Sequence, residues 1–364
     1  MADIAKAWVF SGPDKSFDLQ EFEFPVLKKG EILVKNIFCT ICKSDLHTFL
    51  GTRSGPVPSI LGHEILGEIV QLSEDSSHDY WGNSLKTGDL ITWTLMASCG
   101  KCKNCVRGIP QKCLQIKKYG HEKIGNHYKL TGGFASHTHL LPGTTVYRLK
   151  NNIDKKILAG LNCSWATVAA IIRNYGDVKG KNVIIFGAGM LGVVASMMCK
   201  EMGAKNIITA EKNNFRLGLI RYFGTDHIIP ATLNNGFFKE KLQQYLNTVD
   251  VDVIFEMTGA NQAIIQALDI ATVGTEIILA GSVFPVNNVS FNPEQIVRKL
   301  IKIKGVHNYT PADLANAIDF VEKAVTKYPL NLLFEESVFD LESVDKALER
   351  AQSGVLHRVA IDLS

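Results

Sequence analysis

The chain has 364 residues, of which 46% are hydrophobic and 21% are charged. The length predicts two or three domains, and the composition is close to the globular average. Together they exclude a disordered protein, a collagen-like fibre and a small disulfide-stapled scaffold. Lys and Arg number 39 and Asp and Glu 36, a net charge of +3. This excess is too small for a dedicated nucleic-acid-binding protein, although it allows a local basic pocket for a small anion.

The first residues and the apolar runs predict a cytoplasmic protein without a membrane span. The start, MADIAKAWVF, lacks the charged and apolar regions of a secretion signal. The longest uncharged apolar stretch, Val183 to Cys199, is too short to span a bilayer and contains three glycines. Four of the eight cysteines fall between Cys99 and Cys113. Without a secretion signal, this clustering indicates metal binding rather than disulfides.

Three passages with different patterns follow one another along the chain. Residues 1 to about 160 predict short strands, because alternating runs such as EILVKNIFC and EILGEIV are separated by turn pairs such as Lys29-Gly30. From about 180 to 306, strands alternate with helices, which predicts a parallel sheet covered by helices. The expected strands are 183–186, 207–210, 251–255 and 276–280, with helices over 191–202 and 263–273. The last 58 or so residues return to mixed α and β structure, with a helix beginning near Pro311 and a final strand in HRVAIDL.

A glycine-rich turn lies between the first predicted strand and helix of the middle passage. NVIIFGAGMLG has the G-x-G-x-x-G pattern, with Gly187, Gly189 and Gly192. These glycines allow a tight turn, a close approach of a pyrophosphate and close packing of helix on strand. Glu211 ends the next strand, where a carboxylate binds ribose hydroxyls and repels a 2′-phosphate. The pattern therefore predicts NAD rather than NADP. The alternatives are a plain turn with an exposed Glu, and NADP bound with the help of nearby Lys212 and Arg216.

Four cysteines with the spacing C-x2-C-x2-C-x7-C predict a structural zinc site. They are Cys99, Cys102, Cys105 and Cys113. Four thiolates complete a tetrahedral zinc site and leave no open position. An iron–sulfur cluster is the competitor, but the ferredoxin run ends C-x3-C-P, whereas Leu114 follows the last cysteine here.

A second set of metal-binding residue types is spread along the chain. Cys42 begins CKSDLH, His63 lies in GHE, and Cys163 precedes the glycine turn. Two thiolates and an imidazole leave a fourth zinc position open, as in catalytic sites. Each residue also has an ordinary interpretation: Cys163 as a small buried side chain and His63 as a hydrogen-bonded core histidine. Spacing alone does not decide between the two.

In order, CKSDLH, LGHEILGEIV, the four-cysteine segment, NCSWAT and FGAGMLG resemble the zinc-dependent medium-chain alcohol dehydrogenases over essentially the whole chain. The resemblance implies an α/β protein with a GroES-like catalytic domain from both chain ends and an inserted Rossmann domain. The implied bounds are 1–164, with the zinc lobe at about 95–116, then 165–306, then 307–364. It also implies two zinc ions per chain: a catalytic one on Cys42, His63 and Cys163, and a structural one on the other four cysteines.

The resemblance also assigns roles around the catalytic zinc. Glu64 matches the family's acidic residue behind the metal, and Asp45 the carboxylate that orients the ligand histidine. Ser44 and His47 match a relay that carries the substrate's proton to solvent. The alternatives are a turn-stabilising hydroxyl and a surface histidine.

Further cofactor contacts are implied at four positions. Lys43 and Arg358 match cations that face the pyrophosphate, although either could be a solvated surface charge. Thr167 matches a residue beside the nicotinamide, and Gly281, in the turn Ala280-Gly281-Ser282, matches the loop that meets the carboxamide.

The substrate pocket is the least specific part of the pattern. Arg53 lies in the loop GTRSGPVP, where the family often has an apolar residue, and a guanidinium there suits a phosphate, phosphonate or carboxylate. The alternative is a loop arginine in solvent. Leu95 and Phe134 are candidate pocket walls or core residues. The run NCSWATVAAIIRNYGDVKGKNV also resembles the family branch associated with phosphonate catabolism.

The predicted function is a zinc- and NAD-dependent alcohol dehydrogenase acting on a small alcohol or aldehyde, with a Lewis-acidic cation that polarises the substrate oxygen. The alternatives are a polyol or sugar-alcohol dehydrogenase of the same superfamily and a non-catalytic dinucleotide sensor. Cys163 and the complete four-cysteine set argue against the polyol branch. The resemblance further implies a homodimer or homotetramer.

Overall fold

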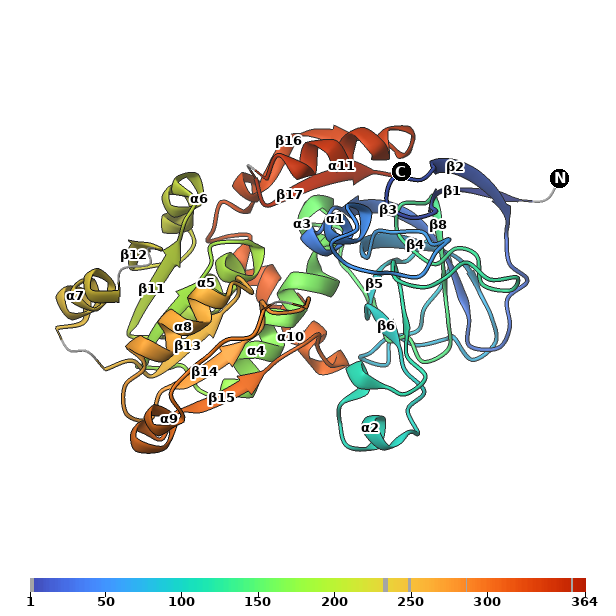
Figure 1. The fold of residues 1–364 in the computed structure, drawn as a ribbon. Helices are drawn as coiled ribbons and strands as arrows, with labels where there is room; N and C mark the ends of the chain where they lie inside the picture. Colours follow the sequence, from blue (N-terminus) through green and yellow to red (C-terminus); the bar gives the residue numbers. More distant parts are fainter. Residues whose placement is uncertain (1–2, 232–234, 248–249, 286, 355) are drawn as a thin grey trace. The chain divides into compact units, whose positions relative to one another are not determined.

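The computed structural model describes residues 3–231, 235–247, 250–285, 287–354 and 356–364. The chain divides into two compact units, which are described separately (Figure 1). Unit 1 holds residues 1–166, 310–322 and 330–364, and unit 2 holds residues 167–309 and 323–329. Both ends of the chain therefore belong to unit 1. Among the described residues, no helix has the length and apolar character needed to cross a membrane.

Unit 1 is built around a seven-stranded, mainly antiparallel sheet. Its strand order is β16-β17-β3-β4-β5-β9, and β8 also pairs with β3. The last strand of the chain lies beside β3, with Ala360 opposite Thr40. Two small two-stranded sheets complete the unit. The strands are β1 (Ile4–Phe10), β2 (Phe17–Glu23), β3 (Ile32–Thr40), β4 (Glu64–Leu72), β5 (Leu90–Trp93), β6 (Met96–Ala97), β7 (Lys117–Lys118), β8 (His137–Leu140), β9 (Val146–Arg148), β16 (Phe334–Phe339) and β17 (Arg358–Asp362).

The helices of unit 1 are mostly short. In Figure 1, α2 lies in a lobe that extends from the strands of unit 1. The helical elements are α1 (Lys43–Phe49), α2 (Lys103–Val106), η1 (Pro110–Lys112), α3 (Lys155–Ala159), the π-helical turn η2 (Leu161–Trp165), α10 (Pro311–Ala324), whose last two residues belong to unit 2, η4 (Leu330–Leu333), η5 (Leu341–Ser343) and α11 (Val344–Gln352).

Unit 2 contains a six-stranded parallel sheet flanked by helices (Figure 1). Its order, β12-β11-β10-β13-β14-β15, is the doubly wound 3-2-1-4-5-6 arrangement, whose switch point lies between β10 and β13. The strands are β10 (Asn182–Phe186), β11 (Asn206–Glu211), β12 (His227–Pro230), β13 (Val253–Glu256), β14 (Glu276–Leu279) and β15 (Lys302–Gly305). The helical elements are α4 (Ala166–Tyr175), which begins in unit 1, α5 (Met190–Glu201), α6 (Asn214–Leu219), η3 (Ile220–Tyr222), α7 (Asn235–Leu246), α8 (Asn261–Ile270) and α9 (Pro293–Lys299).

The central strands of unit 2 form around continuous apolar runs, 183–186 in β10 and 253–255 in β13. Every residue of β10 and β13 is buried, as expected for strands covered on both faces. Each fully buried Val, Ile or Phe side chain contributes roughly 1.5–3 kcal/mol relative to exposure. The following helix, α5, ends before Gly203, whose φ of +80° suits the left-handed cap position that glycine favours. The predicted parallel sheet and the β-rich first passage are confirmed, with bounds shifted by a few residues.

Candidate functional site

Asp45 joins two segments that carry candidate metal ligands. It lies in the first turn of α1 and is 1% exposed. One carboxylate oxygen accepts from the Cys42 backbone N–H at 3.0 Å, and the other accepts from the Gly62 N–H at 3.2 Å and from His63 Nδ1 at 2.9 Å. Because a carboxylate only accepts, His63 carries its proton on Nδ1. The lone pair of His63 Nε2 is therefore available to a metal.

The structure brings Cys42, His63 and Cys163 together. Their ligand atoms and a carboxylate oxygen of Glu64 all lie within 4.8 Å of one another. Cys163 Sγ is 3.4 Å from His63 Nε2. Zinc bonds of typical length at a tetrahedral angle would place S and N about 3.6 Å apart. This donor set and spacing fit one zinc ion. Cys163 lies in the π-helical turn η2, an irregularity that is frequent at functional sites.

Glu64 is held away from the role of a fourth ligand. Both of its oxygens accept from Arg358, from Nε and from Nη2, each at 2.7 Å. The Thr40 hydroxyl donates to the same carboxylate at 2.6 Å. Glu64 is 0% and Arg358 6% exposed, and such a buried bidentate pair is costly to break. With Glu64 engaged by Arg358 and Thr40, the remaining candidate metal ligands of this group are Cys42, His63 and Cys163.

The surroundings of Cys42 favour its ionised form. A hydrogen bond from Cys163 lowers the pKa of Cys42 well below its usual value, and the charge of Arg358 acts in the same direction against burial. The Arg358 guanidinium also lies 3.8 Å from Cys42 Sγ. Because the thiolate is the form that binds metals, Cys42 is prepared for a cation.

Ser44 and His47 share one face of α1, three residues apart. Ser44 Oγ lies 3.4 Å from His63 Nε2. The Thr52 hydroxyl donates to the His47 carbonyl, so its oxygen accepts from His47 Nδ1 at 2.8 Å, which leaves Nε2 as the basic nitrogen. Burial lowers the pKa of His47, and the charges of Lys43 and Arg53 add to this effect. His47 is thus neutral at pH 7 and able to accept a proton.

The four cysteines of the lobe also converge. Their sulfur atoms lie within 4.8 Å of one another, and Cys102 Sγ is 3.5 Å from Cys105 Sγ and 3.9 Å from Cys113 Sγ. Zinc–sulfur bonds of about 2.3 Å would place the sulfurs about 3.8 Å apart. Backbone N–H groups donate to them, and those of Leu114 and Cys105 lower the pKa of Cys102 to about 6. This arrangement fits a single ion, and it is too compact to surround an iron–sulfur cluster.

The backbone geometry of the glycine turn in unit 2 explains why glycine occupies the three positions of the G-x-G-x-x-G motif. Gly187 has a φ of +101°, and an added Cβ there would lie 2.8 Å from Thr258 Cγ2. An added Cβ at Gly192 would lie 1.8 Å from the Gly187 carbonyl oxygen, so only glycine allows this packing of α5 on β10. At Gly189, the N-cap of α5, an added Cβ meets no atom within 4 Å. That space at a helix N-terminus fits a pyrophosphate.

Glu211 lies beside this turn, as its position in the sequence predicts. It accepts from the Ala188 N–H at 2.8 Å, and its other oxygen accepts from the N–H groups of Lys212 and Asn213. Each carboxylate oxygen has further acceptor capacity, which a ribose hydroxyl can use.

Glu256 is a buried residue that the sequence analysis missed. It ends β13, next to the switch point of the sheet. One oxygen accepts from the Thr258 N–H and hydroxyl and from the Gly259 N–H, while burial raises its pKa. The 258–259 segment packs against Gly281, where an added Cβ would lie 2.2 Å from Gly259 N. A charged residue at the end of an apolar strand was the available signal.

Other predicted contacts are placed as follows. Lys43 is exposed on α1, and Thr167 is half-buried near the start of α4. Arg358 was predicted to face the pyrophosphate, and in this structure Glu64 occupies two of its donor groups. Leu95 is buried. Phe134 is fully buried in the core of unit 1, where its ring would meet a Cβ added at Gly62 at 2.6 Å. Its placement corresponds to the core alternative rather than to a pocket wall.

Arg53 lies beside His121, a residue that the sequence analysis did not select. The Nη1 of Arg53 donates to His121 Nε2 at 2.9 Å. His121 in turn lies against His63, with ring centroids 5.1 Å apart. Nothing in KKYGHEK marks this residue, because its significance comes from contacts with Arg53 and His63, which are distant in sequence.

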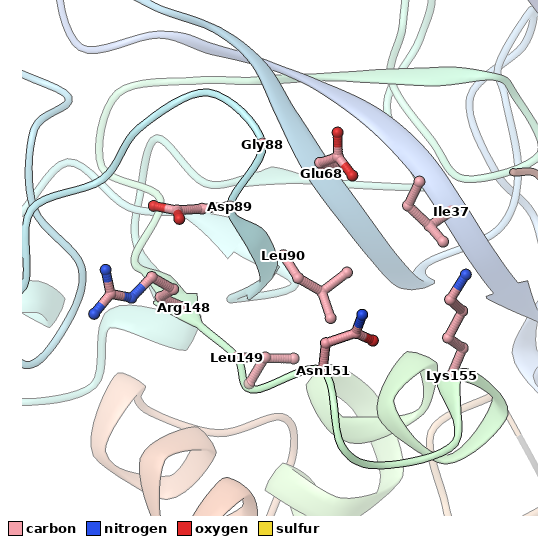
Figure 2. A pocket seen from close by; sticks show the side chains of 9 residues that line it. All are labelled: Ile37, Glu68, Gly88, Asp89, Leu90, Arg148, Leu149, Asn151 and Lys155. Atoms are coloured by element: carbon pink, nitrogen blue, oxygen red, sulfur yellow. The ribbon is translucent and has the colours of Figure 1, made fainter.

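A separate pocket of about 260 Å³ lies in unit 1 (Figure 2). Acidic and basic side chains both line it, and none of the predicted site residues does. Its lining comprises Ile37, Glu68, Gly88, Asp89, Leu90, Arg148, Leu149, Asn151 and Lys155.

Comparisons with known families match both halves of the chain. The alcohol dehydrogenase GroES-like domain matches residues 28–151, and the zinc-binding dehydrogenase domain matches residues 191–323. These matches confirm the predicted GroES-like and Rossmann domain types.

Characterised relatives and solved structures are similar over nearly the whole chain. The 5-exo-hydroxycamphor dehydrogenase of Pseudomonas putida is 25% identical over 94% of this chain and 95% of its own length. The L-threonine 3-dehydrogenase of Pyrococcus furiosus is 28% identical over 84% of both chains. The crystal structure of an alcohol dehydrogenase from Thermotoga maritima has a TM-score of 0.92, with 28% identity and 99% of both chains covered. Structures of this fold have been solved with NADP and with NADH.

Replacing Asp45 by Asn is expected to weaken zinc binding by about 10- to 100-fold, because the single amide oxygen cannot serve all three donors that orient the ligand segments. Zinc per chain after dialysis against a chelator measures this. The four-cysteine lobe is the internal control: we expect its equivalent of zinc to remain while the other is lost. Retention of both equivalents would contradict the role of Asp45.

Proposed function

Because this chain belongs to the zinc-dependent medium-chain dehydrogenase/reductase family, we propose that it oxidises a small alcohol, or reduces the corresponding aldehyde or ketone, with NAD(H). The observation that carries this proposal is the convergence of Cys42, His63 and Cys163 with a fourth position left open. When bound, zinc supplies a Lewis acid that polarises the substrate oxygen, and NAD supplies the hydride acceptor. The residues of the chain hold these groups and move the proton.

The two units have different tasks in this proposal. Unit 1 is the catalytic part and holds both zinc ions, one at the reacting centre and one in the four-cysteine lobe. Unit 2 is the NAD-binding part, with the pyrophosphate at Gly189 and the nicotinamide end near Thr167 and Gly281. The free thiols of all these ligands suit a reducing, cytoplasmic location.

Glu211 supports NAD over NADP. Its carboxylate lies at the end of β11 against the glycine turn. A 2′-phosphate there would place two negative charges together, whereas a hydroxyl can donate a hydrogen bond. We therefore expect a preference for NAD.

In this proposal, two side chains of α1 carry the hydroxyl proton of the alcohol to solvent. The alcohol must lose its hydroxyl proton, and Ser44, beside His63 Nε2, can accept it while donating its own onward. His47, one turn further along α1, accepts that proton and exchanges it with solvent. Asp45 keeps His63 in the required tautomer and takes no proton itself.

The edge strand of unit 2 supports a homo-oligomer. All four residues of β15 are exposed, and β15 ends the six-stranded sheet. Nearby Val297 and Leu300 are 72% and 69% exposed. An exposed edge with apolar neighbours favours pairing with a second copy.

We expect sedimentation velocity to show dimers or larger species, and Ile303→Glu to shift them towards monomer. A wild-type monomer of 40.1 kDa would contradict this proposal.

The proposed activity is tested by metal analysis together with an assay of alcohol-dependent NAD reduction, with NADP run in parallel. We expect zinc at both sites, turnover of at least one small alcohol, and higher kcat/KM with NAD. Cys163→Ala should abolish turnover, since one metal ligand is lost. Cys199→Ala, which removes a buried thiol of α5, is the matched control and should retain it. Dinucleotide binding without turnover across a wide alcohol and aldehyde panel would instead indicate a sensor.

Replacing His47 by Gln is expected to lower kcat by roughly 100-fold near pH 7, the lower end of general acid–base effects, because water can partly replace a half-buried group. The loss should shrink as pH rises, since hydroxide can then take the proton. Steady-state kinetics between pH 6 and 10 measure this. Equal pH profiles for the variant and the wild type would remove His47 from the relay.

A further inference from the structure

A fully buried carboxylate, that of Glu256, lies at the crevice of the parallel sheet in unit 2. Glu256 ends β13 and pairs with Phe186, the last residue of β10, so it borders the point where the strand order reverses. In a doubly wound sheet of this order, two mononucleotide-binding halves meet at that point. The glycine turn and Glu211 belong to the first half, which begins with β10, whereas Glu256 ends the first strand of the second half.

One oxygen of Glu256 holds the turn that follows β13. Its Oε1 accepts from the Thr258 N–H at 2.7 Å, from the Gly259 N–H at 2.9 Å, and from the Thr258 hydroxyl. The same hydroxyl oxygen accepts from the Ala260 N–H at 2.9 Å. The backbone of residues 258–260, which leads into α8, is therefore fixed by a single side chain.

The turn 258–260 is packed tightly between two other turns. On one side, an added Cβ at Gly281 would lie 2.2 Å from Gly259 N and 2.5 Å from Thr258 N. On the other side, an added Cβ at Gly187 would lie 2.8 Å from Thr258 Cγ2. The Glu256 carbonyl oxygen also accepts from the Gly281 N–H at 3.0 Å. A displacement of the turn would therefore be felt at both Gly187 and Gly281.

The other oxygen of Glu256, Oε2, has no hydrogen-bond partner within the described part of the chain. Glu256 is 0% exposed, and buried polar atoms without partners are unfavourable and rare in native structures. Burial raises the pKa of Glu256, while hydrogen bonds from Thr258, Gly259 and Gly281 oppose this effect. The three residues before it in β13 are apolar. The carboxylate is therefore better explained by where it places the turn than by its contribution to stability.

We propose that Glu256 is a positioning residue for the nicotinamide half of NAD, because it holds the turn 258–260 between Gly187 and Gly281 in the shape that receives this half. The assignment rests on the proposed function, since it takes NAD to bind at the crevice of unit 2. Gly281 is expected to meet the carboxamide, and the turn that Glu256 fixes packs directly against it. Adenosine lies in the other half, beside Glu211. Glu256 should therefore affect the binding of NAD but not the binding of the adenosine half alone.

The test compares the binding of NAD with that of ADP, which lacks the nicotinamide and its ribose. Calorimetry on the zinc-loaded full chain gives both Kd values without turnover. We expect Glu256→Leu to raise the Kd for NAD by about 10-fold or more, as when at least one hydrogen bond to a ligand is lost. The Kd for ADP should not change. Glu256→Gln keeps an acceptor oxygen for the same donors and should keep most of the affinity for NAD.

A milder substitution tests the same contact if Glu256→Leu does not fold. Thr258→Val removes one of the three donors to Glu256 and the acceptor of the Ala260 N–H, with little change in side-chain shape. It should weaken NAD in the same direction as Glu256→Leu and leave ADP unchanged. Circular dichroism and urea unfolding show whether each variant is folded.

Asp252→Leu is the matched control. Asp252 directly precedes β13, at the opposite edge of the sheet from Glu256. Its carboxylate also holds backbone, because it accepts from the Asn182 N–H at 2.8 Å, and it pairs with Lys181 at 3.1 Å. We expect this substitution to lower stability and to leave the Kd values for NAD and ADP unchanged.

The outcomes separate a positioning role from a structural one and from the proposed function. Equal weakening of NAD and ADP in Glu256→Leu, or weakening of NAD in Asp252→Leu by the same factor, would overturn the positioning role. A loss of NAD affinity in Glu256→Gln as large as in Glu256→Leu would also overturn it. A wild type that binds NAD but oxidises no alcohol would contradict the proposed function and leave this test intact, whereas one that binds ADP but not NAD would overturn both.

Discussion

The candidate catalytic centre depends on one buried carboxylate. Asp45 accepts hydrogen bonds from the backbone of Cys42 and Gly62 and from the ring of His63, so it fixes both the distance between two chain segments and the tautomer of the imidazole. These three contacts lie within a short helix and a neighbouring loop, neither of which is held in place by its own regular structure. The positions of the candidate ligands Cys42 and His63 therefore depend on hydrogen bonds to Asp45 and not on apolar packing alone.

A second buried contact ties the end of the chain to the same centre. Arg358, at the start of β17, holds Glu64, at the start of β4, through two hydrogen bonds of 2.7 Å. Removing two charges from water carries a large desolvation cost, so such pairs are poor sources of net stability. The Arg358–Glu64 pair instead keeps the Glu64 carboxylate bound to Arg358, so that it is not available to the candidate metal ligands. It also explains why residues more than 290 positions apart must belong to one unit.

The sequence predicted those features whose physical cause is local. The glycine turn was recognisable because the positive φ of Gly187 and the contact of Gly192 with the Gly187 carbonyl are local features, and strand β10 because the apolar run 183–186 is continuous. The four lobe cysteines were close enough in sequence to imply one ion. Cys42, His63 and Cys163 needed the family resemblance, since spacing alone left their roles open.

Features that depend on contacts between distant residues were not predictable in this way. The pairing of Arg358 with Glu64 required the register of β17 against β3, and the burial of Phe134 under Gly62 required the path of a long loop. His121 gave no signal, because the short segment around it has no periodicity and its partner Arg53 lies 68 residues away in the sequence. Glu256 offered a signal, a charge ending an apolar strand, that was not used.

The position of Cys42 at the N-cap of α1 couples metal occupancy to local folding. A helix of seven residues has little stability of its own, because the nucleation penalty is spread over few hydrogen bonds. A cation bound to the capping thiolate would therefore anchor the first turn, and with it the backbone that carries Ser44 and His47. Metal binding at the proposed catalytic site would then be coupled to the proposed proton relay, because loss of the ion would also destabilise the helix that carries both relay residues.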